Sequence, residues 1–129
     1  MDKLQTLSAP TGRLLLATIF IMSGLSKIGT YAGTQGYMEA MGVPGGLLPL
    51  VIALEVLGGA ALVLGFKARL TAFALAGFSV VSAALFHADF TDQMQMMMFM
   101  KNITIAGGLL MVVAQGAGAY SLDSRNKTA

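Results

Sequence analysis

Glu55 is the residue of this chain whose position most clearly demands a chemical explanation. It lies near the middle of a twenty-seven-residue stretch, 40–66, that carries no other charge and is long enough to cross a bilayer. An ionised carboxylate at the centre of such a segment costs about 2.5–3.5 kcal/mol on insertion scales. Chains keep one only where it faces a partner, a water-filled cavity or a ligand. The sequence therefore predicts a membrane-embedded protein with a polar site in its interior.

Several other polar residues adjoin the apolar segments at positions that would bring them near Glu55. The candidates for a ligand-binding pocket in the outer half of a helical bundle are Lys27, Glu55, His87, Lys101 and Asn102. Glu55 is expected to pair with Lys101 or Lys27, because an unpaired ion at that depth is costly. Gly58 and Gly59 follow one turn later and permit close approach of a neighbouring helix, which places Glu55 inside the bundle. The pattern assigns no catalytic residue.

Two other interpretations of these polar residues stay open. The network could serve only to fix the packing of four similar apolar helices, since polar side chains hold transmembrane helices together at about 0.6–2 kcal/mol each. The methionine-rich run 94–102 invites a copper(I) site, whose ligands would be Met94, Met97, Met98 and His87. Ordinary apolar packing at a membrane boundary explains the run better, so we predict no metal.

Four apolar segments must position these residues, and they predict an all-α integral membrane protein, a four-transmembrane-helix bundle in one domain, 1–129. The expected spans are residues 12–28, 46–66, 69–87 and 95–118. Only 11% of the residues are charged, against about a quarter in soluble domains. Pro10 and Pro49 each suit the first turn of a helix, and Thr91 suits the N-cap of the last one. A short interfacial helix is expected within 33–46.

The basic residues set the expected orientation of the bundle. Six of the eight fall on one side of a four-span layout: Lys3, Arg13, Lys67, Arg69, Arg125 and Lys127. Because positive charge is enriched in cytoplasmic loops, this distribution places both termini in the cytoplasm. Arg13 is expected to act there as an anchor whose long side chain reaches out towards the lipid headgroups.

The composition excludes several classes of protein. The chain has no cysteine, which removes disulfides, thiolate metal sites and Cys-x-x-Cys redox chemistry. Its single histidine rules out bis-histidine haem ligation within one chain, so we expect no covalent cofactor. The net charge of +2 gives no indication of nucleic-acid binding. Any redox chemistry must use a bound small molecule or a partner.

Four segments that cover most of the chain resemble the DoxX family, and in particular its enterobacterial inner-membrane branch. They read GRLLLATIFIMSGLSKI (12–28), YAGTQGYMEAMGVPG (31–45), LEVLGGAALVLGF (54–66) and FHADF…FMKNITIAGGLL (86–110). Residues of this sequence that match the family pattern are Arg13, Lys27, Glu55, His87, Lys101 and Asn102. The resemblance implies a four-helix, multi-pass protein of the bacterial inner membrane, related to terminal-oxidase and thiosulfate:quinone oxidoreductase subunits and to members of oxidative-stress complexes.

Two functions follow from these expectations. In the first, the protein is a quinone- or small-ligand-binding accessory component of a membrane redox or oxidative-stress system, with Lys27, His87, Lys101 and Asn102 as donors, Glu55 as a proton-exchanging group and a partner subunit as the electron donor. In the second, it is a non-enzymatic assembly or interaction protein whose buried charges only lock the bundle. Under either function the protein would contact the lipid bilayer. The sequence leaves open whether the protein forms a homo-oligomer and whether it is an enzyme.

Overall fold

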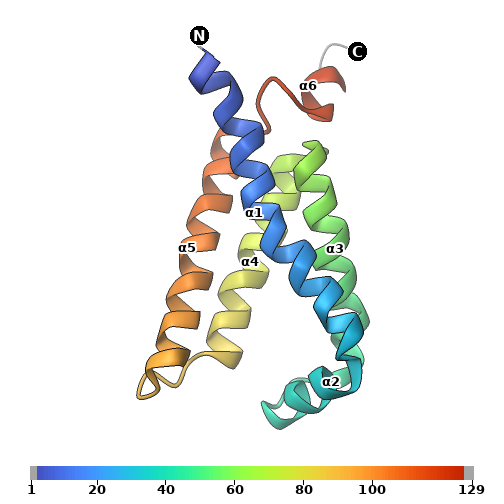
Figure 1. Ribbon diagram of the computed structural model, residues 1–129, viewed down its shortest axis with the longest axis vertical. Coiled ribbons are helices and arrows are strands. Elements are labelled where there is room, and N and C mark those ends of the chain that lie inside the picture. Colours follow the sequence, from blue (N-terminus) through green and yellow to red (C-terminus); the bar gives the residue numbers. More distant parts are fainter. Residues whose placement is uncertain (1–2, 127–129) are drawn as a thin grey trace.

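The computed structural model describes residues 3–126, and every regular element in that range is helical (Figure 1). The elements are α1 (Lys3–Gly29), α2 (Tyr31–Ala40), the 3₁₀ turn η1 (Gly45–Leu47), α3 (Leu48–Leu64), α4 (Ala68–Phe86), α5 (Gln93–Gln115) and α6 (Leu122–Asn126). Four of them are long and apolar enough to cross a membrane: α1, η1 with α3, α4 and α5. This result confirms the all-helical class and the number of candidate spans.

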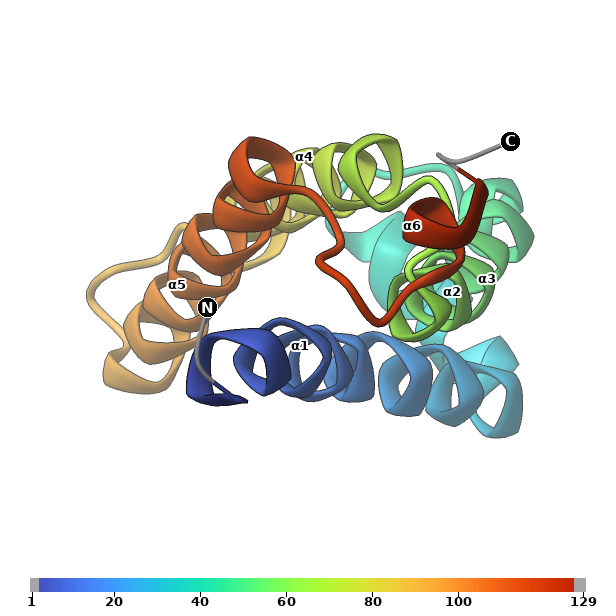
Figure 2. The ribbon, with the colours of Figure 1, turned by 90° about the horizontal axis from the view of Figure 1, so that it is seen from above.

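The helices form two pairs that are close together at one end and apart at the other. α1 packs along α3 and α4 packs along α5, whereas contacts between the pairs are fewer. The start of α1 and the short helix α6 lie at the same end of the bundle, which we call the terminal end (Figures 1 and 2). The pairs separate towards the opposite end, which contains α2 and which we call the α2 end. The residues of the buried apolar core are Ala17, Phe20, Leu62, Ala72, Leu75, Ala76, Ala106 and Leu109.

Glycines bring α1 and α3 into close contact. A Cβ atom on Gly59 would lie 2.6 Å from Cγ1 of Ile21, and one on Gly24 would lie 2.6 Å from Cγ2 of Val56. Each helix therefore contributes a glycine at which the other helix passes without a side chain between them. This agrees with the expectation that the glycines after Glu55 allow close approach, and it explains why Glu55 is buried between helices, with 3% of its surface exposed.

Several element ends differ from the sequence-based expectations. The prediction that Pro10 begins a helix is wrong: Pro10 lies inside α1, which starts at Lys3 and continues along a groove beside α5. Pro49 does lie in the first turn of α3. The short helix expected within 33–46 begins earlier, at Tyr31, and ends at Ala40, because the turn that follows contains Gly42 with a φ of 83°.

The N-cap of α5 lies one residue beyond the expected Thr91. The carboxylate of Asp92 accepts a hydrogen bond of 2.9 Å from the backbone N–H of Met94 and so satisfies one of the free donors in the first turn. The hydroxyl of Thr91 instead donates to the carboxylate of Asp89. The helix consequently starts at Gln93, so Lys101 and Asn102 are its ninth and tenth residues.

Candidate functional site

All five residues predicted to form a pocket line one cavity of about 260 Å³ between the two helix pairs, on the α2 side of the bundle. They come from four different helices: Lys27 from α1, Glu55 from α3, His87 from the end of α4, and Lys101 and Asn102 from α5. The cavity exists because the pairs separate in this region, so that side chains of α1 and α3 face those of α4 and α5 across an open space.

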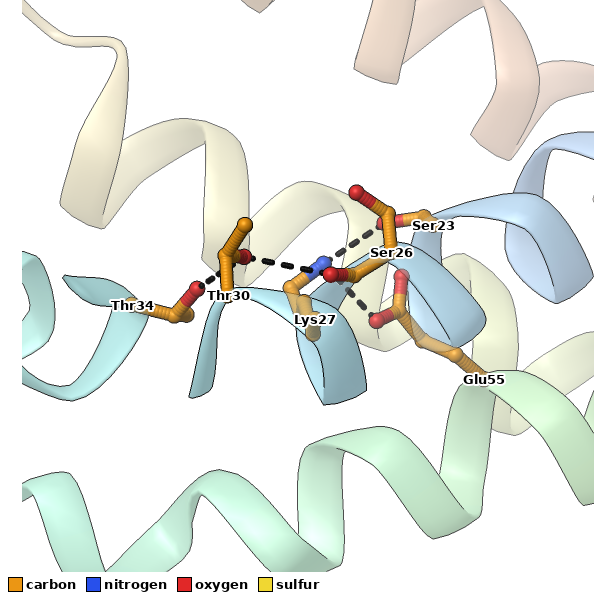
Figure 3. Close-up of polar contacts among 6 residues, drawn as sticks. All are labelled: Ser23, Ser26, Lys27, Thr30, Thr34 and Glu55. Atoms are coloured by element: carbon orange, nitrogen blue, oxygen red, sulfur yellow. Dashed lines mark hydrogen bonds and ion pairs between the residues drawn. The ribbon is translucent and has the colours of Figure 1, made fainter. Parts of the chain in front are cut away.

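An ion pair between α1 and α3, drawn in Figure 3, joins two residues that line the cavity, Lys27 and Glu55. Nζ of Lys27 lies 2.8 Å from Oε1 of Glu55 and donates a second hydrogen bond of 2.6 Å to Oγ of Ser23, one turn earlier on α1. Of the two partners that the sequence allowed for Glu55, the structure selects Lys27. The Glu55 side chain is 4% exposed and that of Lys27 27%, so the carboxylate is buried and the ammonium group stays in contact with open space.

One oxygen of the Glu55 carboxylate is available to a ligand. Within residues 3–126 the only hydrogen bond that Glu55 receives on its side chain goes to Oε1. No fully buried side-chain oxygen or nitrogen of the described residues is left without a partner. Oε2 must therefore border open space, which at this position is the cavity that Glu55 lines.

The opposite wall consists of side chains from α4 and α5. Nδ1 of His87 lies 2.8 Å from Oε1 of Gln95 and donates to it, which leaves Nε2 of a neutral ring as an acceptor. Nδ2 of Asn102 donates to the backbone carbonyl of Ser79 at 3.3 Å and joins α5 to α4. The nearest polar contact of Lys101 is Sδ of Met98 at 3.8 Å, and within the described chain it has no carboxylate partner.

The charges around the cavity do not balance. Lys27 and Lys101 contribute two positive charges and Glu55 one negative charge, so the site carries a net charge of +1 when His87 is neutral. Lys27 is neutralised by its ion pair, and the excess charge is therefore that of Lys101. The cavity offers an ammonium donor, a carboxylate oxygen and a ring nitrogen to an occupant.

Three further residues shape the cavity, although the sequence suggested no role for them. Tyr37 of α2 stacks on Phe86 of α4, with ring centroids 5.5 Å apart and an angle of 26° between the planes. Met38, 5% exposed, is also part of the lining. α2 thus covers the opening between the helix pairs. The available signal was the adjacent tyrosine and methionine, Tyr37 and Met38, within the segment expected to form a short interfacial helix.

The residues of the copper hypothesis are divided by the structure. Met98 and His87 line the cavity, whereas Met94 and Met97 do not and are 67% and 64% exposed. Met94 and Met97 therefore point to the outside of the bundle, where apolar side chains suit a membrane boundary.

Arg13 is placed differently from the expected snorkelling anchor. It is 2% exposed and its guanidinium turns into the bundle at the terminal end. NH1 donates to the carbonyls of Leu62 at 2.9 Å and Val63 at 2.8 Å, while Nε donates to Ala117 at 2.9 Å and NH2 to Tyr120 at 2.6 Å. The carbonyls in the last turn of a helix have no partner within it and carry partial negative charge, so the C-terminal end of α3 attracts this cation.

A second contact at the terminal end attaches α6 to the turn between α3 and α4. The carboxylate of Asp123 accepts hydrogen bonds from the backbone N–H groups of Lys67 at 2.6 Å and Ala68 at 2.7 Å. These donors begin α4, so Asp123 caps that helix from a distant part of the chain. Gly65 has a φ of 70°, and a Cβ atom there would lie 2.9 Å from NH1 of Arg13.

Comparison with known proteins identifies relatives that cover almost the whole chain. The model of the family described as DoxX matches residues 9–88. The chain is 51% identical over 123 residues to the inner membrane protein YqjF of Escherichia coli (strain K12), which covers 95% of each chain. It is 35% identical over 120 residues to the inner membrane protein YphA of the same organism, which covers 88% of this chain and 86% of that protein. No solved structure matches it.

Proposed function

The chain belongs to the DoxX family, and from that premise we propose that it is an inner-membrane protein that binds a quinone or a similar small oxygen-bearing ligand in the cavity beside Glu55. It would act as an accessory component of a membrane redox or oxidative-stress system. The excess of basic residues at the terminal end supports an orientation with both termini in the cytoplasm. The cavity then opens towards the outer face.

The unpaired ammonium group of Lys101 is the observation that carries this proposal. Lys101 is the ninth residue of α5, roughly 12 Å along the helix from its start at 1.5 Å per residue. Lys101 is exposed, and a cation on a membrane-crossing helix is costly unless it meets a partner. No carboxylate of the described chain serves it. An electron-rich oxygen of a ligand in the cavity would supply that partner.

The other lining residues suit a planar carbonyl compound. The stacked rings of Tyr37 and Phe86 offer an aromatic wall, and Lys101 offers a donor to a carbonyl oxygen. Oε2 of Glu55 is positioned to hold or accept a proton. The volume of about 260 Å³ lies just below the range of about 300–1,000 Å³ usual for small-molecule pockets, so it suits a head group whose tail extends into lipid.

A bound quinone would supply the redox chemistry, because the chain has no cysteine and no pair of histidines of its own. The residues of the chain would bind and orient the head group and exchange its protons. Electrons would come from a partner subunit.

Binding of short-tailed quinones and quinols to the purified protein tests the proposal. Titration of the wild type in mild detergent, followed by calorimetry, should show saturable binding. Lys101→Met should weaken binding by at least about tenfold, since a hydrogen bond from a charged group contributes about 1.5–3 kcal/mol. Lys3→Met, the same change at the far end of the bundle, should leave it unaltered. Absence of saturable binding to the wild type would overturn the proposal.

The ion pair itself supports a second candidate, a non-enzymatic assembly or interaction protein. Lys27 and Glu55 join α1 to α3, and Asn102 joins α5 to α4, so part of the network needs no ligand. In that case Glu55→Gln would lower stability without changing any response to quinone. A stoichiometric partner protein retained in a mild-detergent pull-down, together with a wild type that binds no quinone, would favour this candidate.

A further inference from the structure

We propose that the terminal end of the bundle binds one anionic phospholipid, in a site separate from the cavity beside Glu55. Its head group would lie against Lys67 and Arg69, and one acyl chain would lie between α1 and α5. Two adjoining hollows at this end carry the inference. We call them the basic hollow, of about 520 Å³, and the apolar groove, of about 780 Å³.

The basic hollow contains a cation that makes no ion pair with any residue of the described range 3–126. Lys67 and Arg69, from the turn before α4 and its first residues, both line it. The guanidinium of Arg69 crosses the backbone of the loop after α5: a Cβ atom on Gly116 would lie 3.1 Å from its Nε. Among residues 3–126 this side chain makes no ion pair. Nζ of Lys67 lies over the ring of Phe66, 5.7 Å from its centroid, and stays free to meet an anion.

One carboxylate also lines the basic hollow, and each of its oxygens already accepts a backbone hydrogen bond. Both oxygens of Asp123 accept backbone N–H groups, those of Lys67 and Ala68. With Lys67, Arg69 and Asp123 counted together, the hollow keeps a net charge of +1. A phosphate diester of a phospholipid complements that charge, and Arg binds phosphate oxygens through its planar fork of donors.

The apolar groove adjoins the basic hollow, and one loop forms a wall of both. The two share four residues at the end of α5 and in the loop after it: Gln115, Gly116, Gly118 and Ala119. This loop separates Arg69 on one side from α1 on the other, since a Cβ atom on Gly118 would lie 2.7 Å from Cβ of Ala9. A molecule with a charged head and an apolar chain would reach both hollows by lying across this loop.

The walls of the groove provide apolar surface against which an acyl chain can lie. Leu4 and Leu16 of α1 and Met111 and Val112 of α5 provide apolar surface, and Gly12 leaves space where a side chain would otherwise stand. A groove next to a cluster of basic residues at the end of transmembrane helices is a common setting for anionic lipid recognition. The combination favours a phospholipid over a free phosphate ion, which would use only the basic hollow.

Native mass spectrometry of the full chain with two lipids tests the proposal. The probes are phosphatidylglycerol and phosphatidylcholine with identical acyl chains, added at equal concentration to the delipidated protein. We expect the wild type to retain phosphatidylglycerol several-fold better. Arg69→Gln should lower the retained phosphatidylglycerol about fivefold, which corresponds to about 1 kcal/mol per basic side chain beside an anionic head group. Lys67→Gln should act in the same direction and replaces Arg69→Gln should that variant fail to fold.

Substitutions of two glycines separate the acyl groove from the head-group site. Gly12→Leu fills the groove, and no heavy atom lies within 4 Å of the Cβ position there. It should reduce retention of both lipids. Gly107→Leu on α5, also with no heavy atom within 4 Å but outside the groove, is the matched control and should bind as the wild type.

Three results would overturn the proposal. One is equal retention of the two lipids by the wild type. Another is unchanged retention in both Arg69→Gln and Gly12→Leu. The third is displacement of phosphatidylglycerol by millimolar inorganic phosphate together with no effect of Gly12→Leu, which would assign the basic hollow to a free anion.

Discussion

Replacement of Glu55 by glutamine removes the charge from the carboxylate while keeping its shape, and so isolates the contribution of the ion pair. In the wild type, Oε1 of Glu55 receives Nζ of Lys27 at 2.8 Å. Glutamine can still accept that hydrogen bond, but it leaves two lysines beside the cavity and no negative charge. We therefore expect Glu55→Gln to lower the free energy of unfolding.

The geometry of the pair sets the size of this effect. At 2.8 Å and an effective dielectric constant of about 20, the attraction between unit charges is about 6 kcal/mol. Desolvation of each ion offsets several kcal/mol of that gain. Breaking a fully buried pair costs about 3–5 kcal/mol, but Lys27 keeps 27% of its side chain exposed and can be solvated in part. We predict a loss of about 1–3 kcal/mol.

A double-mutant cycle measures the coupling between the two charges. The free energy of unfolding is obtained from denaturation by sodium dodecyl sulfate in mixed micelles for Glu55→Gln, Lys27→Met and the double variant. We expect a coupling energy of at least about 1 kcal/mol. Glu39→Gln, the same change on an exposed carboxylate of α2, should alter stability by less than about 0.5 kcal/mol. Additive effects of Glu55→Gln and Lys27→Met would refute the claim that the pair stabilises the bundle.

Three further substitutions test other contacts with the same assay. Arg13→Met should cost about 2–4 kcal/mol because four carbonyls lose a charged donor, whereas Lys3→Met should be near neutral; equal effects would contradict the buried position of the guanidinium. Gly24→Ala should cost about 1–3 kcal/mol through overpacking against α3, while Gly29→Ala, with open space around it, should not destabilise. Asp123→Asn should cost about 0.5–2 kcal/mol by weakening the cap of α4, and an unchanged stability would show that this cap contributes nothing.

The number of spans was predictable from the sequence, but the ends of the helices were not. Hydropathy identifies a membrane-crossing segment because about 20 apolar residues are needed to span the hydrocarbon core. It sets no limit on a helix that continues beyond the core, as α1 does from Lys3 through Pro10. The N-cap of α5 was missed by one residue because Thr91 and Asp92 have similar capping ability and only their local hydrogen bonds distinguish them.

The candidate site was likewise predictable from the sequence only in part. The five pocket residues could be predicted to converge because polar groups in apolar helices avoid lipid and face the bundle interior. The sequence could not predict that Lys27 is the partner of Glu55, since Lys27 and Lys101 both fit the helical spacing. This pairing depends on the close contact of α1 with α3 at Gly24, which places Lys27 beside Glu55, while Lys101 stands across the cavity on the other helix pair.

The contacts of Arg13 at the terminal end of the bundle influence the geometry of the cavity on the α2 side. Its guanidinium, from α1, holds carbonyls at the end of α3 and in the loop that follows α5, and so it joins the two helix pairs where they meet. Elsewhere the pairs touch much less than the helices within each pair do. The distance between Glu55 and Lys101 across the cavity therefore depends on the angle that this contact maintains. Arg13, although it is buried far from the cavity, therefore helps to position the candidate site. A change at Arg13 should alter the affinity for the proposed quinone as well as stability.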